Sequence, residues 1–199
     1  RGLGRKQRRE QNVRTITPPE GAASGQRYAF QTGAPATTAV IVGRGIATDG
    51  SRLDLGIPAR CASSPIFVFT DTTVNRLYGD NFVAALEARG YLVHRIVMED
   101  GEVSKTITNY ARLVDHVLEK GIDERSVLVS LGGGAVCNVC GFVASTLYRC
   151  IGLIHVPTTL MAQCDAAISH KQALNGARGK NLIGAYYPPM RVVVDVNFL

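Results

Sequence analysis

Three polar side chains suited to binding anions lie in one short, glycine-punctuated part of the sequence. They are Lys171, Lys180 and Asn181, within the run from Asp165 to Gly184. Ammonium and carboxamide groups donate hydrogen bonds to phosphate and hydroxyl oxygens. Most neighbours in this run are apolar or glycine, and a lysine in such surroundings favours an anionic partner. We therefore predict a loop that binds an anionic, hydroxyl-rich ligand such as a sugar phosphate.

A triple glycine, Gly132–Gly134, forms a second candidate element. It follows the apolar run Ser126–Leu131, which has the length of a buried strand, and it opens an apolar segment of small residues. Glycine lets the backbone approach a pyrophosphate, and a helix that begins there offers free N–H groups. Cys137 occupies the third position of the G-x-G-x-x-G fingerprint, so the motif is incomplete and a tight structural turn is the alternative.

Further polar residues follow other predicted strands. Asp100 and Glu102 come after one strand, where an acidic side chain is suited to accept hydrogen bonds from a ribose. Lys105, close by, is either a ligand contact or a solvated residue at a helix start. Thr158 and Thr159 offer two hydroxyls after another strand, and a helix cap is the alternative role for them.

The histidines and cysteines do not predict a metal site in this sequence. The four histidines lack zinc-site spacing, and His94 and His155 fall in predicted strands, where we expect them in the core. His170, beside Lys171, is the only histidine that remains a site candidate. Five cysteines are an odd number without the spacing of a disulfide scaffold, so we expect reduced thiols in a cytoplasmic protein.

Strand and helix patterns alternate along the chain, at roughly 30 residues per unit. Strands are predicted over residues 28–32, 39–42, 65–70, 91–98, 126–131, 151–156 and 191–195, and helices over 74–89, 104–120 and 135–147. This alternation indicates an α/β fold with a doubly wound parallel sheet, Rossmann-like in character. Ligands of such sheets bind beyond the carboxyl ends of the strands, where Asp71, the triple glycine and Thr158 are expected.

Most of the net charge of +6 belongs to the start of the chain. Residues 1–27 hold seven Arg or Lys and two Glu, so the rest of the chain carries only +1. We interpret residues 1–27 as a basic flexible leader and residues 28–199 as the folded domain, and we expect no nucleic-acid partner. There is no apolar run of transmembrane length, so we expect no membrane partner.

Four blocks together resemble the dehydroquinate-synthase superfamily of sugar phosphate cyclases. The resemblance runs from about residue 65 to the C-terminus, and it is densest in Glu102–Lys105, Gly132–Phe142, Pro157–Asp165 and Gly179–Gly184. It implies that Asp165, Lys171 and Asn181 face the substrate as catalytic residues. It also implies an NAD site made of Asp71, Asp100, Glu102, Lys105, Gly133, Gly134, Asn138, Thr158, Thr159, Lys171, Lys180, Phe198 and Leu199.

The resemblance implies a reaction as well. Cyclases of this family oxidise a ring hydroxyl transiently with NAD, eliminate phosphate, return the hydride and close a carbocycle by an intramolecular aldol reaction. They also carry zinc or cobalt, whose ligands lie in a helical C-terminal domain that is absent from the sequence shown. They are often dimers, so a homodimer is one expectation, although no interface is readable from the residues.

The resemblance leaves the substrate open. Dehydroquinate synthases usually carry Asp where this chain has Asn138, and a Lys-Thr-Gly-x-Asn block where it has Lys171–Asn175. Both features look more like 2-deoxy-scyllo-inosose synthases, which use glucose 6-phosphate, although other blocks also suit 3-dehydroquinate synthase. A metal-dependent polyol or alcohol dehydrogenase of related fold, and a truncated nucleotide-binding piece without activity, are the alternatives from other classes.

Overall fold

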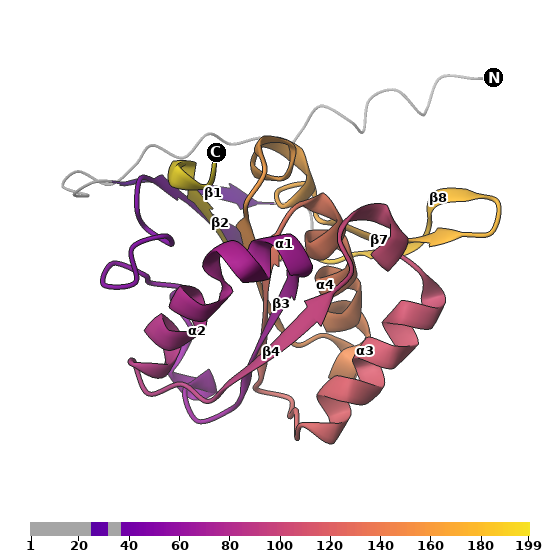
Figure 1. The fold of residues 1–199 in the computed structure, drawn as a ribbon, viewed down its shortest axis with the longest axis horizontal. Coiled ribbons are helices and arrows are strands. Elements are labelled where there is room, and N and C mark those ends of the chain that lie inside the picture. Colours follow the sequence, from indigo (N-terminus) through magenta and orange to yellow (C-terminus); the bar gives the residue numbers. More distant parts are fainter. Residues whose placement is uncertain (1–24, 32–36) are drawn as a thin grey trace, which may run out of the picture.

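The structure is a computed structural model that describes residues 25–31 and 37–199 (Figure 1). Most of the predicted basic leader, residues 1–24, lies outside the described residues. The first described strand, β1, spans Gly25–Gln31 and so begins within the range assigned to the leader. The division of the chain into leader and domain stays a prediction.

The expected doubly wound parallel sheet is confirmed. Seven strands lie in the order β1-β2-β9-β6-β5-β3-β4, and all neighbours pair parallel except β1 and β2, which pair antiparallel at one edge. After β1, the strands are β2 Thr37–Gly43, β3 Ile66–Asp71, β4 Val93–Met98, β5 Val127–Gly132, β6 Gly152–Pro157 and β9 Arg191–Asp195. The helices are α1 Thr72–Val74, α2 Asp80–Glu87, α3 Ile107–Glu119 and α4 Gly134–Thr146.

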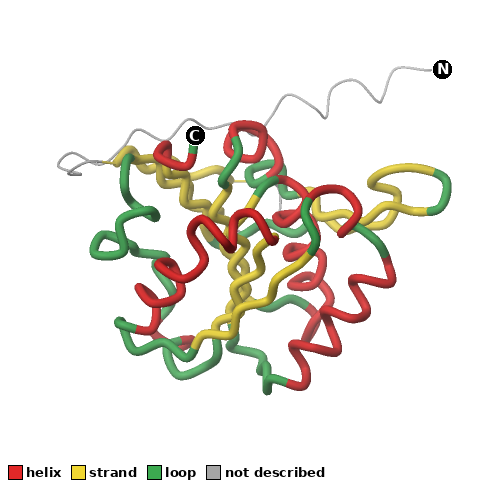
Figure 2. The backbone as a smooth tube through the Cα atoms, in the orientation of Figure 1, coloured by secondary structure: helices red, strands yellow, loops and turns green. Residues whose placement is uncertain are grey.

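Helices cover both faces of the sheet, which explains why its central strands read as continuous apolar runs (Figure 2). In β3, Ile66 and Val68 pack in a cluster with α2, whereas Phe67 and Phe69 pack in a second cluster with α3 and α4. All four side chains are fully buried. The alternation of side chains along one strand therefore supplies two cores at once.

Two helices differ in their bounds from the sequence prediction. The helix expected over 74–89 begins at Thr72, and a π-helical turn at Asn75–Gly79 separates α1 from α2. The helix expected over 104–120 begins only at Ile107, because the Thr106 hydroxyl caps it by accepting a 3.1 Å hydrogen bond from the backbone N–H of Asn109. A separate 3₁₀ turn over Gly101–Ser104 precedes it.

The prediction of a loop between Asp165 and Gly184 is wrong. Its central part is an antiparallel hairpin of β7, Lys171–Gly176, and β8, Gly179–Tyr186, which stands apart from the main sheet (Figure 1). The buried face of β7 packs on α4. Gly184 permits the close pairing, since a Cβ there would lie 2.2 Å from the backbone oxygen of Gln172.

The strand order creates a crevice at the carboxyl end of the sheet. The chain passes from β3 outward to β4 and then returns across β3 to β5, from which it continues to β6. The direction of winding therefore reverses between β3 and β5, and such a reversal is where open α/β sheets bind ligands. Within the described residues, no helix combines the length and apolarity needed to cross a bilayer.

Candidate functional site

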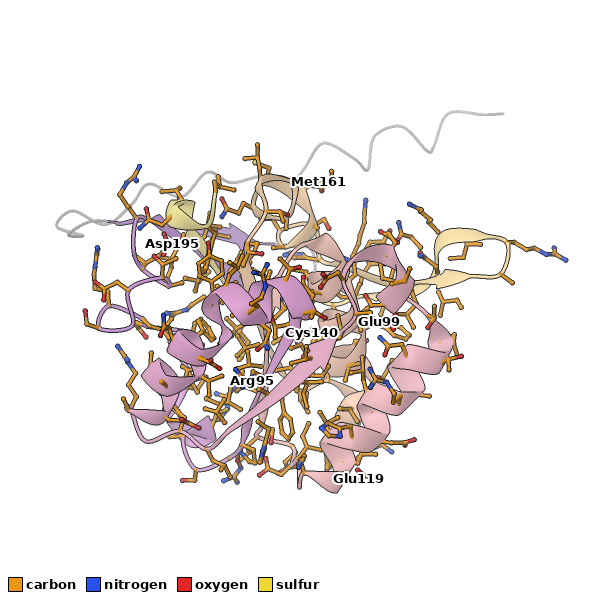
Figure 3. The ribbon with its side chains drawn as sticks, in the orientation of Figure 1. Arg95, Glu99, Glu119, Cys140, Met161 and Asp195 are labelled. Atoms are coloured by element: carbon orange, nitrogen blue, oxygen red, sulfur yellow. The ribbon has the colours of Figure 1, made fainter. Side chains whose placement is uncertain are left out.

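A cavity of about 760 Å³ lies at this end of the sheet, between the start of α4 and the β7–β8 hairpin. Met161, on its rim, lies at the carboxyl end of the sheet, whereas Glu119 at the end of α3 lies at the opposite end (Figure 3). Seven of the predicted site residues line the cavity, namely Glu102, Lys105, Gly134, Asn138, Asp165, Lys171 and Asn181. The fold thus brings together residues from four separate sequence blocks.

Lys105 is the buried cation of this cavity, with 2% of its surface exposed. Its Nζ donates hydrogen bonds to Oδ1 of Asn138 at 3.0 Å and to Oδ1 of Asn181 at 2.5 Å. Glu102 lies 3.7 Å away, at ion-pair distance. Burial lowers the pKa of Lys105, Glu102 opposes this change, and the charge of Lys180 adds to it. The ammonium is therefore a desolvated charge, which interacts with an anion more strongly than a solvated lysine does.

Three elements hold Lys105 in place: the 3₁₀ turn before α3, helix α4, and the hairpin. Asn138, on α4, also donates its Nδ2 to the backbone oxygen of Lys171 at 3.1 Å, which ties the helix to the start of β7. The pKa of Glu102 is lowered, first by a hydrogen bond from Asn175 and also by Lys105 and Lys180. The carboxylate thus stays ionised opposite the ammonium.

The first turn of α4 is open toward ligands. No side chain caps this helix, whose N-cap is Gly133. The triple glycine serves close approach rather than unusual backbone angles, because Gly133 has a φ of −74°. A Cβ on Gly133 would meet the Thr159 side chain at 3.3 Å, and one on Gly132 would meet Val136 at 2.6 Å. An uncapped helix start beside glycines, which have no side chain, is suited to bind a phosphate group.

The two threonines after β6 have different roles. Thr158 is 7% exposed, and its hydroxyl has no hydrogen-bond partner among the described residues. Thr159 instead accepts a 3.3 Å hydrogen bond from the backbone N–H of Ala162, so the helix-cap alternative holds for its hydroxyl. A buried hydroxyl without a partner costs about 1–3 kcal/mol, and a ligand at the neighbouring glycines would remove that cost.

Asp71 and Asp100 lie at adjacent strand ends but do not line the cavity. Asp71 caps α1 by accepting a 2.7 Å hydrogen bond from the Val74 N–H. Asp100 accepts hydrogen bonds from the backbone N–H and the hydroxyl of Thr73, at 3.0 and 2.7 Å. Burial raises the pKa of Asp71, whereas the hydrogen bonds from Thr73 lower the pKa of Asp100. Their carboxylates form a second polar group on the β3–β4 side of the crevice.

The remaining predicted residues lie away from the cavity. Lys180 is exposed on β8, and its charge acts on Glu102 and Lys105 without lining the space. Phe198 packs in the core, with its ring edge-on to Tyr78 at 4.9 Å, while Leu199 is exposed. Their assignment to a nucleotide site stays a prediction.

His170 is also not among the cavity residues. It has a left-handed φ of +57°, and its Nε2 lies 3.2 Å from the hydroxyl of Thr38. Because that hydroxyl donates its proton to the backbone oxygen of Pro189, Nε2 of His170 must be the donor in this contact. Burial lowers the pKa of His170. The structure thus places His170 in a structural contact with β2.

Sequence reasoning missed a buried polar chain under the cavity. Gln172, which lines the cavity, places Nε2 3.4 Å from Nε2 of His155, and Nδ1 of His155 lies 2.7 Å from the Ser130 hydroxyl. The Ser130 hydroxyl in turn donates a hydrogen bond to the thiol of Cys137 at 3.5 Å. Burial lowers the pKa of His155 to about 3, so the ring is neutral and its two nitrogens have fixed donor and acceptor roles. The expectation of a satisfied core residue is met for His155 but is wrong for His94, which is only half-buried.

Asp195 is a second residue that the sequence did not single out, and it lies at the end of β9 (Figure 3). Its buried carboxylate accepts hydrogen bonds of 2.8 Å from the N–H groups of Gly45, Ala47 and Thr48. Asn197 N–H donates to it at 3.0 Å. Burial works to raise the pKa of Asp195, but these backbone hydrogen bonds outweigh it and the net change is a lowered pKa. Asp195 thereby fixes the loop after β2.

The fold and the cavity define a Rossmann-like α/β domain with its candidate site at the topological switch point. A family model described as 3-dehydroquinate synthase N-terminal matches residues 95–199. That range is more than half of the chain, and the chain belongs to this family of enzymes.

Individual relatives include two kinds of cyclase. 2-Deoxy-scyllo-inosose synthase from Streptomyces ribosidificus is 44% identical over 141 residues, which cover 71% of this chain and 36% of the relative. 3-Dehydroquinate synthase from Pelotomaculum thermopropionicum is 41% identical over 160 residues, covering 80% of this chain and 42% of the relative. The chain therefore spans about two fifths of the length of these relatives.

A solved relative has the same fold. The crystal structure of 2-deoxy-scyllo-inosose synthase complexed with carbaglucose-6-phosphate, NAD⁺ and Co²⁺ superposes with a TM-score of 0.76 at 29% identity. The match covers 88% of this chain and 47% of that one.

Proposed function

We propose that the complete protein is an NAD-dependent sugar phosphate cyclase of the 2-deoxy-scyllo-inosose synthase type, acting on glucose 6-phosphate. The observation that carries this proposal is that one cavity brings the uncapped start of α4 and Lys105 together with Asp165, Lys171 and Asn181. Cations are suited to a phosphate, and carboxylate and amide groups to the hydroxyls of a sugar. The relatives named above support the same class of substrate and cofactor.

The residues present fit NAD. The open N–H groups at Gly133 and Gly134 suit a pyrophosphate, and the unpartnered hydroxyl of Thr158 lies at the adjacent strand end. Asp71 and Asp100 offer carboxylate acceptors for ribose hydroxyls on the β3–β4 side. When bound, NAD supplies the acceptor for a hydride from a ring hydroxyl of the substrate.

Three side chains on the other wall of the cavity would hold the substrate. Lys171, at the start of β7, supplies an ammonium group for the phosphate, and Asp165 supplies a carboxylate that accepts sugar hydroxyls. Asn181 offers the donor half of its amide, because its oxygen already accepts from Lys105. These contacts would fix the orientation of the reacting carbon.

A metal ion does not fit the described residues alone. They contain no group of three His, Cys, Asp or Glu side chains placed to hold one. Any zinc or cobalt of the complete protein would therefore depend on ligands from outside this part of the chain, as in the helical domain that the family resemblance implies. No step of the proposal relies on a metal held by these residues.

3-Dehydroquinate synthase activity is the second candidate, since relatives with that name are nearly as similar to this chain. The inosose type is favoured by Asn138, whose amide both accepts from Lys105 and donates to the backbone of Lys171. A carboxylate at that position would keep only the first of these hydrogen bonds. A polyol dehydrogenase and an inactive nucleotide-binding piece remain the candidates from other classes.

The decisive assay measures phosphate release by the full-length protein with NAD and added Co²⁺ or Zn²⁺. Glucose 6-phosphate and a seven-carbon keto-acid phosphate are compared as substrates. Phosphate release from glucose 6-phosphate without net NADH supports the proposal, whereas release from the keto-acid phosphate alone assigns 3-dehydroquinate synthase. Stoichiometric NADH without phosphate would assign a dehydrogenase.

Lys171→Ala tests the site within the same assay. We expect turnover to fall by roughly a thousandfold or more, because the substrate phosphate loses its cation, while the unfolding temperature stays within a few degrees. The Lys171 side chain is exposed at the cavity, so its loss leaves no buried group unpaired. Turnover close to that of the wild type would contradict the assignment of the cavity.

A further inference from the structure

Asn175 lies at a break in the β7–β8 hairpin. Leu174 pairs with Ile183 and Gly176 pairs with Gly179, and the register shifts between these two pairs, so Asn175 is left out of the ladder. Its backbone N–H points out of the hairpin and donates a 2.8 Å hydrogen bond to the backbone oxygen of Lys105. The extra residues of this irregularity lie on β8, where residues 180–182 face Asn175 alone. Bulges of this kind are frequent beside functional sites.

The Asn175 side chain contacts two further groups around Lys105. Its Nδ2 donates to Oε2 of Glu102 at 2.8 Å, and its Oδ1 accepts from the backbone N–H of Asn181 at 3.0 Å. Among the described residues, Glu102 and Asn181 are two of the three groups that contact the Lys105 ammonium, the third being Asn138. One asparagine therefore holds both the carboxylate and one amide that surround the buried cation.

The bond to Asn181 also stabilises an unfavourable backbone. Asn181 has a φ of +57°, a left-handed conformation that is unfavourable for a non-glycine residue. This conformation places the Asn181 side chain against Nζ of Lys105, 76 residues away in the sequence. Without the acceptor on Asn175, the backbone N–H of Asn181 would lose its partner. The left-handed conformation of Asn181 would then be less stable.

These contacts determine the direction of the remaining N–H of the Lys105 ammonium group. An ammonium group has three N–H donors, of which the amides of Asn138 and Asn181 take two. Glu102, at 3.7 Å, attracts the charge but lies beyond hydrogen-bond distance. We propose that Asn175 is a positioning residue that, through Glu102 and Asn181, directs the third donor of Lys105 into the cavity to bind ligand. The identity of that ligand as NAD rests on the proposed function, whereas the positioning itself does not.

The first test measures the chemical reactivity of Lys105 in the nucleotide-free, full-length protein. Trace acetylation followed by peptide mass spectrometry gives its rate relative to Lys120, which is exposed just after the end of α3, whereas the cavity lies before its start. We expect Asn175→Ala to raise the relative rate of Lys105 by roughly tenfold, because contacts of this kind couple by about 1 kcal/mol or more. Asn81→Ala, an exposed asparagine on α2, is the matched control and should leave the ratio unchanged.

The second test exchanges the two polar groups. Asn175→Asp keeps an acceptor for the Asn181 N–H but sets its carboxylate against that of Glu102, so it should free Lys105, although by less than Asn175→Ala does. In the double variant Glu102→Gln/Asn175→Asp, the new amide donates to the new carboxylate, so the contact returns with its direction reversed. We expect the double variant to recover protection of Lys105 by about threefold or more over Asn175→Asp.

The outcomes separate the two proposals. A relative Lys105 rate that is unchanged in Asn175→Ala, or a double variant no better than Asn175→Asp, overturns the positioning role. Acceleration at every lysine, Lys120 included, overturns it as well, since that result reports general loosening. Calorimetry then measures NAD affinity, which Asn175→Ala should weaken by roughly tenfold. If the labelling results hold but the wild type does not bind NAD, the proposed function fails and the positioning role stands.

Discussion

Gly141→Ala should lower the stability of the protein, although alanine has the higher helix propensity. Gly141 lies in the middle of α4 on the face toward β7. A Cβ there would lie 2.1 Å from Oε1 and 2.3 Å from Cδ of Gln172. Gln172 is held where it is, because it is 1% exposed and its Nε2 donates a 2.9 Å hydrogen bond to the backbone oxygen of Tyr187.

The expected loss outweighs the expected gain. Alanine is better than glycine in a helix interior by about 1 kcal/mol. Against this, overpacking a full core costs about 1–3 kcal/mol. Displacing the Gln172 amide also leaves the carbonyl of Tyr187 unpaired, at a cost of about 1–3 kcal/mol. The net effect of Gly141→Ala should be a destabilisation of about 3 kcal/mol, or roughly 6–12 °C in unfolding temperature for a domain of this size.

The assay is thermal and urea unfolding of Gly141→Ala in two backgrounds. With Gln172 present we expect the loss above. In a Gln172→Ala background the space is empty, so the same substitution should instead stabilise the protein by up to about 1 kcal/mol, since only the helix-propensity gain remains. A stabilising or neutral effect with Gln172 present, or the same loss in both backgrounds, would refute the packing argument.

Three further substitutions follow from the buried polar groups. Asp195→Asn should lower the free energy of unfolding at pH 7 by about 2–4 kcal/mol, because an amide cannot accept from all the backbone donors. The folded pKa of Asp195 lies below the unfolded value, so its contribution is present above about pH 4 and is lost as the pH falls further. Urea unfolding should therefore show the gap between wild type and Asp195→Asn narrowing toward pH 3. Thr158→Val should leave stability unchanged or raise it by about 1 kcal/mol in the nucleotide-free protein, yet weaken NAD binding by roughly tenfold, as calorimetry would show; equal affinity would contradict a ligand role for the hydroxyl. His155 has a folded pKa of about 3, so it removes stability as the pH falls below its unfolded value of about 6.5. It should cost about 2 kcal/mol at pH 5, and His155→Gln should flatten the decline in stability between pH 7 and pH 5 unless another group causes it.

The main sheet could be predicted from the sequence because its signals are local. The apolar runs of β3 and β5 are buried on both faces, and glycines at Gly90 and Gly121 follow the helices with left-handed φ values of +84° and +79°. These features lie within a few residues of the elements that they bound. The alternation of strands and helices then fixed the class of fold.

The hairpin could not be predicted, because its signals depend on contacts far away in the sequence. β8 is mostly exposed and lacks clear alternation between apolar and polar residues. The burial of Lys105 also lacks a local signal in the sequence. Its burial results from acceptors 33 and 76 residues away, at Asn138 and Asn181, and nothing in its own neighbourhood indicates them.

β9 is the last strand among the described residues, yet it lies between β2 and β6 in the middle of the sheet. Ala39 on β2 pairs with Arg191, and Ile154 on β6 pairs with the same residue. During synthesis, the β1–β2 pair has therefore no parallel neighbour until β9 has left the ribosome, and the edge of β6 is also open. Completion of β9 joins two fragments of the sheet that are distant in sequence, which is slow because non-local pairing is slow, and both edges stay exposed to other chains meanwhile. A translational pause or a proteolytic cut just before Arg191 should consequently favour aggregation far more than a cut after Asp195 would.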